Sequence, residues 1–167
     1  GLRRGGAVSV AIVRKTGWFW RGLNALVVVV TLGRNRRFLT AYVTTIGPWI
    51  AVPVGMEPSP ATLVHEGVHV DQFRRLGLGS AVLGILPMAL LYLLLPLPLG
   101  LAWFRWRFER EAYVAGWLDE LGRLDGEHRT ERRLQLIEHG VEQLTTGAYG
   151  WTWPFPAAVR RWFEAHT

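Results

Sequence analysis

The 167-residue chain is long enough to bury a core of its own, and its 50% hydrophobic content with nine Trp excludes an intrinsically disordered protein. It has no cysteine, so disulfides and thiolate-bound metals are excluded, and a metal could be held only by His, Asp or Glu. The net charge of +6 comes almost wholly from Arg and would suit nucleic acid or an anionic membrane, but the chain has no nucleic-acid-binding motif and no nucleic-acid partner is expected.

The first third of the chain predicts a mixture of strands and one apolar helix. The predicted elements are a short strand in "AVSVAIV" (7–13), a helix over 17–33, and strands in "FLTAYVTTI" (38–46) and "WIAVPV" (49–54). The length of 17–33 favours a helix, although its four consecutive valines would also suit a strand. The Gly-Pro pair between the last two strands predicts a break, so they form a hairpin or two neighbouring strands. Because Pro53 cannot donate to a strand ladder, we expect "WIAVP" to lie at a sheet edge.

The segment "EPSPATLVHEGVHVDQFRRLG" (57–77) has clear helix start and stop signals. Ser59 is a good N-cap and Pro60 suits the first helical position. Arg74 and Arg75 suit the C-terminal end of a helix, and Gly77 can close it. We therefore expect one well-bounded helix here.

Residues 76–104 contain no charge, which on length alone is typical of a transmembrane segment. "PLPLG" (96–100) interrupts the run, so we expect an apolar helical hairpin that is either membrane-associated or buried in the core. Further helices are predicted from Leu101 onward and over "GEHRTERRLQLIEHGVEQLT" (126–145), followed by an aromatic, Pro-broken tail packed over the body. The whole chain, 1–167, is predicted to be one α+β domain, mostly helical, with a small sheet before the 57–77 helix.

The predicted 57–77 helix carries the pattern His65-Glu66-x-x-His69. Residues i and i+4 lie on one helix face, so both imidazoles can bind one zinc ion. Glu66 lies about 100° around the helix and need not bind the ion. It can act as the general base, taking a proton from the attacking water and returning it to the leaving amine. A catalytic zinc needs a third protein ligand from elsewhere in the chain.

The third ligand is suggested by "EREAY" (109–113), since no other His has supporting context. This segment resembles the second motif of the gluzincin metallopeptidases, a helix with E-x-x-(A/S)-D. The resemblance implies that Glu109 is the third zinc ligand and that Ala112 lets the two helices approach. Glu111 lies about 200° around a helix from Glu109, so the two cannot both face the ion, and Glu111 is the alternative ligand.

Tyr113 stands where the gluzincin pattern has Asp, which orients a ligand His. Tyr113 could supply one hydrogen bond in that role but no negative charge, and Asp71 and Asp119 are alternatives. The resemblance covers about residues 38–120 and extends to small bacterial gluzincin-like proteins and to membrane metallopeptidases of the heat-shock and CAAX-protease type. It implies a bacterial or phage protein, either membrane-associated or cytoplasmic.

The metal hypothesis restricts the path of the apolar run. His65, His69 and Glu109 flank it, so a single membrane crossing would separate the ligands, and the run must instead return to the same side. We expect a zinc-dependent metallopeptidase whose peptide substrate pairs with the "WIAVP" edge, with Tyr149 and His139 as candidate transition-state stabilisers. The alternative is a non-catalytic protein of zincin-like fold that acts in membrane association or assembly.

Overall fold

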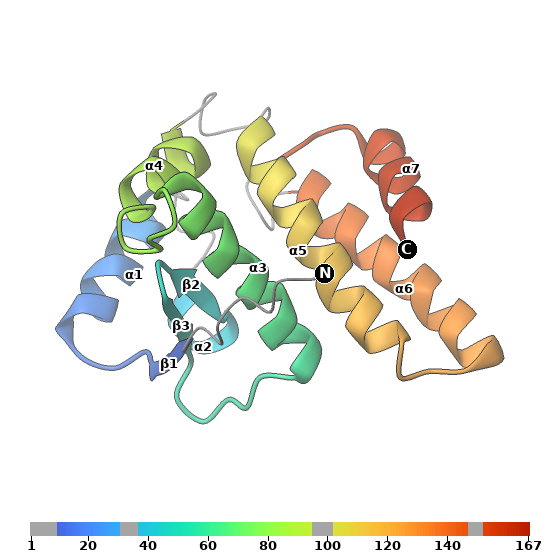
Figure 1. Cartoon of the computed structure of the whole chain (residues 1–167), viewed down its shortest axis with the longest axis horizontal. Helices are drawn as coiled ribbons and strands as arrows, with labels where there is room; N and C mark the ends of the chain where they lie inside the picture. The colour runs from blue at the N-terminus through green and yellow to red at the C-terminus, as the bar shows by residue number, and fades with distance from the viewer. Residues whose placement is uncertain (1–9, 31–36, 95–101, 147–151) are drawn as a thin grey trace, which may run out of the picture.

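The computed structural model describes residues 10–30, 37–94, 102–146 and 152–167. As predicted, the fold is a mostly helical α+β arrangement, with a small sheet beside a group of helices (Figure 1). In chain order the elements are β1 (Ala11–Arg14), α1 (Trp18–Val30), α2 (Phe38–Ala41), β2 (Thr44–Ile46), β3 (Trp49–Val52), α3 (Pro60–Leu76), α4 (Ile85–Ala89), the π-helix η1 (Leu90–Leu94), α5 (Trp103–Leu121), α6 (Gly126–Thr145) and α7 (Pro156–His166).

The sheet has the strand order β1-β3-β2, with β1 parallel and β2 antiparallel to β3. The predicted hairpin is confirmed as β2–β3. The prediction that "WIAVP" forms an edge is wrong, because β3 pairs on both sides and is the central strand. Pro53 does not prevent this, since β3 ends at Val52 and the proline lies outside the ladder. The edges are β1 and β2.

The other predicted N-terminal elements are partly confirmed. The helix expected over 17–33 is α1, and residues 31–33 lie outside the described residues. The strand expected over 38–46 is limited to Thr44–Ile46, because Phe38–Ala41 forms a single helical turn instead. The carbonyls of Phe38, in this turn, and of Tyr42, just after it, both accept hydrogen bonds from the buried ammonium of Lys15. A straight strand would not bring these two carbonyls together.

Helix α3 begins and ends where the sequence predicts. The Ser59 hydroxyl accepts a hydrogen bond from the Thr62 amide at 3.1 Å, and Pro60 is the first helical residue. At the other end the Gly77 amide donates to the Phe73 carbonyl at 2.9 Å. These caps fix the length of α3, and therefore which residues face its neighbours.

The first arm of the predicted apolar hairpin is shorter than expected. Residues 77–84 form a turn, and the helix begins only at Ile85. The turn folds back onto α3 so closely that a Cβ at Gly84 would lie 1.7 Å from the Phe73 carbonyl oxygen. "PLPLG" lies outside the described residues. Among the helices that the structure describes, none combines the length and apolar character needed to cross a membrane.

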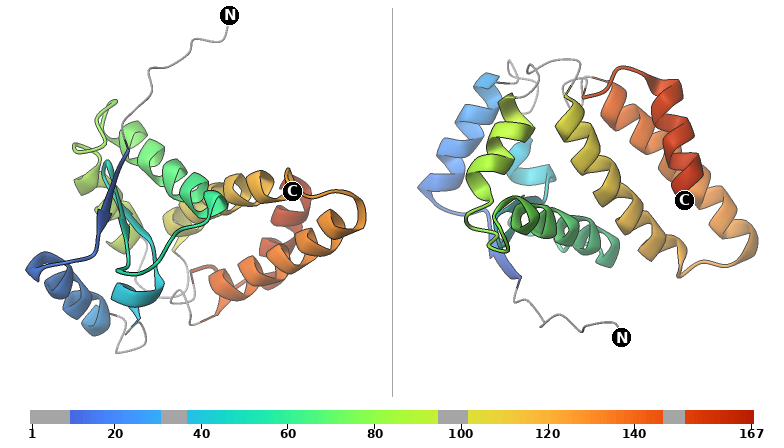
Figure 2. Two further views of the ribbon diagram at one scale, coloured as in Figure 1. Left: turned by 90° about the horizontal axis from the view of Figure 1, so that it is seen from below. Right: turned by 45° about the horizontal axis from the view of Figure 1, so that its top comes forward.

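Helix α3 lies between the sheet and α5, and α6 and α7 pack on the far side of α5 (Figures 1 and 2). One apolar cluster joins β3, α3 and α4, and a second joins α5, α6 and α7. Val159 and Phe163 of α7 are fully buried in the second cluster, which confirms that the tail packs on the body. The two helices that carry the predicted ligands, α3 and α5, are therefore neighbours in the middle of the molecule.

The closest approach of α3 and α5 occurs at Gly116. A Cβ at this position would lie 2.8 Å from the Ala61 carbonyl oxygen and 3.3 Å from the His65 Cβ. Ala112, which the resemblance implied as the contact residue, is also fully buried on the same helix. The absence of a side chain at Gly116 therefore sets the separation of the two helices beside His65.

Substituting Gly116 by Ala should force α3 and α5 apart and lower the free energy of unfolding by about 1–3 kcal/mol, as overpacking does in other cores. Gly67→Ala is the matched control, because a Cβ at Gly67 of α3 would meet no atom within 4 Å. That variant should be more stable than wild type by about 0.5–1 kcal/mol, since Ala favours helix. Urea unfolding of the three proteins measures both effects, and equal stabilities for the two variants would contradict the packing argument.

Candidate metal centre

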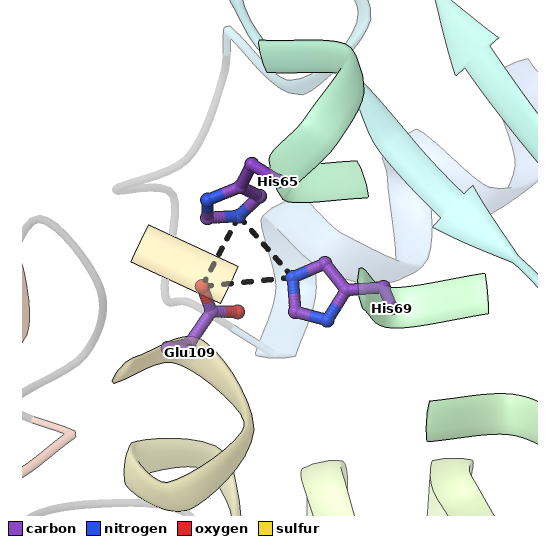
Figure 3. A group of neighbouring side chains, drawn as sticks. All are labelled: His65, His69 and Glu109. Atoms are coloured by element: carbon purple, nitrogen blue, oxygen red, sulfur yellow. Dashed lines mark hydrogen bonds and ion pairs between the residues drawn. The ribbon is translucent and has the colours of Figure 1, made fainter. Parts of the chain in front are cut away.

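Three of the predicted residues, His65, His69 and Glu109, meet between α3 and α5 (Figure 3). The Nε2 atoms of the two histidines lie 3.2 Å apart. The Oε2 atom of Glu109 lies 3.7 Å from Nε2 of His65 and 3.8 Å from Nε2 of His69. The i and i+4 positions on α3 place both rings on one face, and α5 brings the carboxylate to them.

The spacing of these three atoms fits a tetrahedral zinc ion. Zinc bonds to nitrogen and carboxylate oxygen are about 2.0–2.2 Å, which places neighbouring tetrahedral ligands about 3.3 Å apart. Oε2 of Glu109 is buried and has no hydrogen-bond partner, although such an atom normally has one. A cation between the three atoms would satisfy it, so the donor set fits the predicted metal.

The hydrogen bond at Nδ1 of His69 leaves Nε2 as the unprotonated nitrogen of that ring, the form that can bind a metal. The Gln72 amide donates to the Phe108 carbonyl at 2.9 Å, which fixes the orientation of that amide. Its Oε1 then faces Nδ1 of His69 at 2.8 Å and accepts a hydrogen bond from it. This arrangement fixes the tautomer and the ring orientation, the role that a hydrogen-bonded neighbour of a metal ligand commonly has.

Glu109 is oriented by Tyr92 of η1, whose hydroxyl donates to the other carboxylate oxygen, Oε1. Burial and the Glu109 carboxylate raise the pKa of Tyr92 well above its ordinary value, so the hydroxyl stays protonated as a donor. Arg105 lies over the Tyr92 ring, 4.9 Å from its centroid, and donates to the Tyr92 carbonyl at 3.1 Å. The tyrosine therefore holds Oε1 while Oε2 faces the histidines.

Glu66, the predicted general base, is buried beside the three residues and faces the sheet. Its Oε2 accepts a hydrogen bond from the Thr45 hydroxyl of β2 at 2.6 Å. Burial raises the pKa of Glu66 above its ordinary value, while His69 and the Thr45 hydrogen bond oppose the shift. A raised pKa suits a carboxylate that must both accept and return a proton near neutral pH.

Tyr113 contacts the ligand His65 through its ring. The ring centroids lie 5.0 Å apart in an edge-to-face arrangement, and Tyr113 also packs against Trp117 of the α5–α7 cluster. Burial, with a contribution from His69, lowers the pKa of His65 well below its ordinary value, so that imidazole is neutral at pH 7 as metal binding requires. Tyr113 thus lies beside His65, and the hydrogen bond that orients His69 comes from Gln72.

The alternative residues from the sequence lie outside the cluster. Glu111 accepts from Arg75 at 2.9 Å, away from the three ligand atoms. Asp71 pairs with Arg74 of the same helix, and Asp119 pairs with Arg123, which lies just after α5. His139 is exposed on α6, and Tyr149 lies outside the described residues. Of the two candidate carboxylates, Glu109 is therefore the one that faces the histidines.

Lys15 is a buried cation behind the site that the sequence did not single out. Its ammonium donates to the carbonyls of Phe38 and Tyr42 and to the hydroxyl of Thr44, at 2.8–2.9 Å. Burial lowers the pKa of Lys15 to about 8, and the Glu66 carboxylate opposes this shift. Lys15 thereby ties β1 to α2 and to the start of β2, the strand that contacts Glu66.

Comparisons with models of known protein families, with curated proteins and with solved structures find no match for this chain. The chemistry of the site therefore rests on its own residues.

Two of the residues that support the site could have been found from the sequence. Gln72 is three residues after His69 on the same helix face, and Thr45 lies in a predicted strand. Tyr92 and Lys15 carried no such signal.

Replacing Tyr92 by Phe should weaken zinc binding by about 10–100-fold, the usual effect of removing a hydrogen-bond partner from a ligand. The change is nearly isosteric and leaves Oε1 of Glu109 without its donor. Competition titration with a chromophoric chelator measures the affinity. Glu120→Gln is the control, since this residue shares α5 with Glu109 but pairs with Arg132 away from the cluster, and it should bind zinc like wild type. Equal affinities for Tyr92→Phe and wild type would contradict the assigned role.

Lys15 should make stability depend on pH in the alkaline range. Its pKa is about 8 in the folded chain and 10.5 in the unfolded chain, so the unfolded state binds more protons between these values. The free energy of unfolding of wild type, measured against Lys15→Met, should therefore rise from pH 8 to 10.5, by on the order of 1 kcal/mol per pH unit. Urea unfolding at several pH values tests this. Arg21→Met, which removes an exposed cation, should leave the slope unchanged.

Proposed function

We propose that the protein is a zinc-dependent metallopeptidase of gluzincin type. The observation that carries the proposal is the convergence of two imidazole Nε2 atoms and one unpaired, buried carboxylate oxygen at a spacing suited to tetrahedral zinc. The ligand set, two His on one helix and one Glu from a second helix, agrees with the resemblance noted in the sequence. Nitrogen and oxygen ligands without sulfur are also typical of hydrolytic zinc sites.

The residues of this chain have separate roles in the proposed reaction. The zinc ion would supply Lewis-acid activation of the water and of the substrate carbonyl. Glu66 takes the proton from the attacking water and delivers it to the leaving amine. Thr45 holds the Glu66 carboxylate through its hydroxyl. Gln72 and Tyr92 hold the ligands His69 and Glu109 in the orientation that binding requires.

An extended peptide would reach this site along β2. This strand pairs with β3 on one side only and is an edge of the described sheet. Its central residue, Thr45, contacts Glu66, so a peptide added to β2 would pass beside the general base. The edge proposed for the substrate is therefore β2, in place of the central strand β3.

A second candidate function is a non-catalytic protein that keeps the zincin-like arrangement. Tyr113, an uncharged residue at the position where the gluzincin pattern has Asp, favours it. The two functions differ in their dependence on Glu66, because a binding or assembly role needs the fold but no general base.

The decisive experiment measures zinc content and peptide hydrolysis in the same preparations. Glu66→Gln should retain zinc and lose at least about 100-fold in hydrolysis, because only the proton acceptor is removed. His69→Ala and Glu109→Gln should lose zinc, while Glu120→Gln, on the same helix as Glu109, keeps it. A wild-type protein without zinc after reconstitution would rule out the metal site. Zinc-loaded wild type that cleaves no member of a peptide library would favour the non-catalytic candidate.

A further inference from the structure

Large apolar side chains are exposed together on the part of the molecule that contains α1, the turn between β2 and β3, and α4. They include Trp18, Phe19, Trp49, Leu83, Leu86 and Leu90, with 41–86% of each residue exposed. We call this set the apolar face. In both Figures 1 and 2, α1 and α4 lie side by side at the edge of the molecule away from α6 and α7.

A pocket of about 520 Å³ connects the parts of the apolar face. Phe19 of α1, Ile46 and Trp49 of the hairpin, and Ile85 of α4 line it. The turn between β2 and β3 also touches α4 directly, since a Cβ at Gly47 would lie 2.9 Å from Cδ1 of Ile85. Phe19 and Trp49 of the apolar face therefore meet at this pocket, beside α4, which carries Leu86. Exposed apolar side chains grouped in this way typically mark an interaction site.

The turn before α4 presents a further leucine under strain. Leu78 has φ of 53° and is 97% exposed. A left-handed backbone costs roughly 1–2 kcal/mol for a residue with a Cβ, and Gly or Asn would avoid most of this cost. Full exposure means that no packing in the folded chain compensates for it. The exposure and the backbone conformation of Leu78 therefore fit a contact made outside the chain.

The distribution of basic and acidic residues along the chain indicates the kind of partner that the apolar face would bind. Residues 1–56, which include α1 and the whole sheet, contain eight Lys and Arg and no Asp or Glu, and residues 76–108 contain two Arg and no acid. All 13 acidic residues therefore lie in 57–75 and 109–167. Arg14 is paired with Glu57 and Lys15 is buried, but Arg21 is exposed on α1, three residues from Trp18. The apolar face thus lies in parts of the chain that contain basic residues and no acidic ones.

We propose that the apolar face docks on the surface of an anionic lipid bilayer. Leu and Trp side chains would enter the boundary between headgroups and acyl chains, and Arg21 would contact anionic headgroups. Each basic residue near such a surface adds to the attraction. A second copy of this chain fits less well, because face-to-face contact would bring together two regions that contain basic residues and no acidic ones. The proposal is independent of the metal centre.

The proposal is tested by flotation of the protein with vesicles of phosphatidylcholine alone or with 30% phosphatidylglycerol, at low and high salt. Wild type should bind the anionic vesicles, bind neutral vesicles less, and lose affinity as salt rises. Leu83→Asp and Leu86→Asp should each weaken binding by at least about tenfold, since Asp is strongly disfavoured in a bilayer. Arg21→Glu should weaken binding to anionic vesicles more than to neutral ones.

Two further variants separate lipid contact from loss of structure. Leu134→Asp changes a leucine of α6 that is 54% exposed but far along the chain from the apolar face, and it should bind vesicles like wild type. Leu78→Asn should be at least as stable as wild type in urea unfolding and still bind vesicles more weakly, because Asn tolerates the left-handed backbone.

Three results would overturn the proposal. One is a wild type that does not bind anionic vesicles. Another is weakening by Leu134→Asp equal to that by Leu83→Asp. The last is a dimer, seen by light scattering, that Leu83→Asp dissociates without changing vesicle binding. That result would assign the apolar face to a second copy of the chain.

Discussion

The contact between α3 and α5 determines the geometry of the site, because all three proposed metal ligands lie on these two helices. Their separation is set at backbone level, where Gly116 meets the Ala61 carbonyl next to His65. A side chain at this point would change the distance between the histidines and Glu109 directly. The caps of α3 add to this control, since they fix which turn of the helix faces α5.

Residues from outside the two helices each hold one side chain of the candidate site. Thr45 of β2 holds Glu66, and Lys15 ties the neighbouring residue Thr44 to α2. Tyr92 of η1 holds Glu109. Segments that are distant in sequence thus converge on a small buried region. This arrangement explains why a short chain can hold several polar groups in its interior, since most of them have a defined partner.

The parts of the fold with local sequence signals were predictable. The ends of α3 follow from Ser59 and Gly77, and the position of the histidines on one helix face follows from their spacing. The order of the strands was not predictable, because it depends on pairing between β1 and β3, which are far apart in sequence. Pro53 led to the wrong prediction of an edge strand, because a proline affects pairing only if it lies within the strand, and β3 ends one residue before it. Tyr92 lay in an apolar run without periodicity that would distinguish one residue from another.

Glu109 also has a consequence for the stability of the fold. A buried carboxylate oxygen without a hydrogen-bond partner costs free energy that the surrounding hydrogen bonds do not return. The chain therefore carries a destabilising group between α3 and α5. An apolar residue of similar volume would remove this cost, and it would also remove one ligand of the proposed metal centre. Under the proposed function, Glu109 therefore lowers the stability of the fold in return for binding the ion.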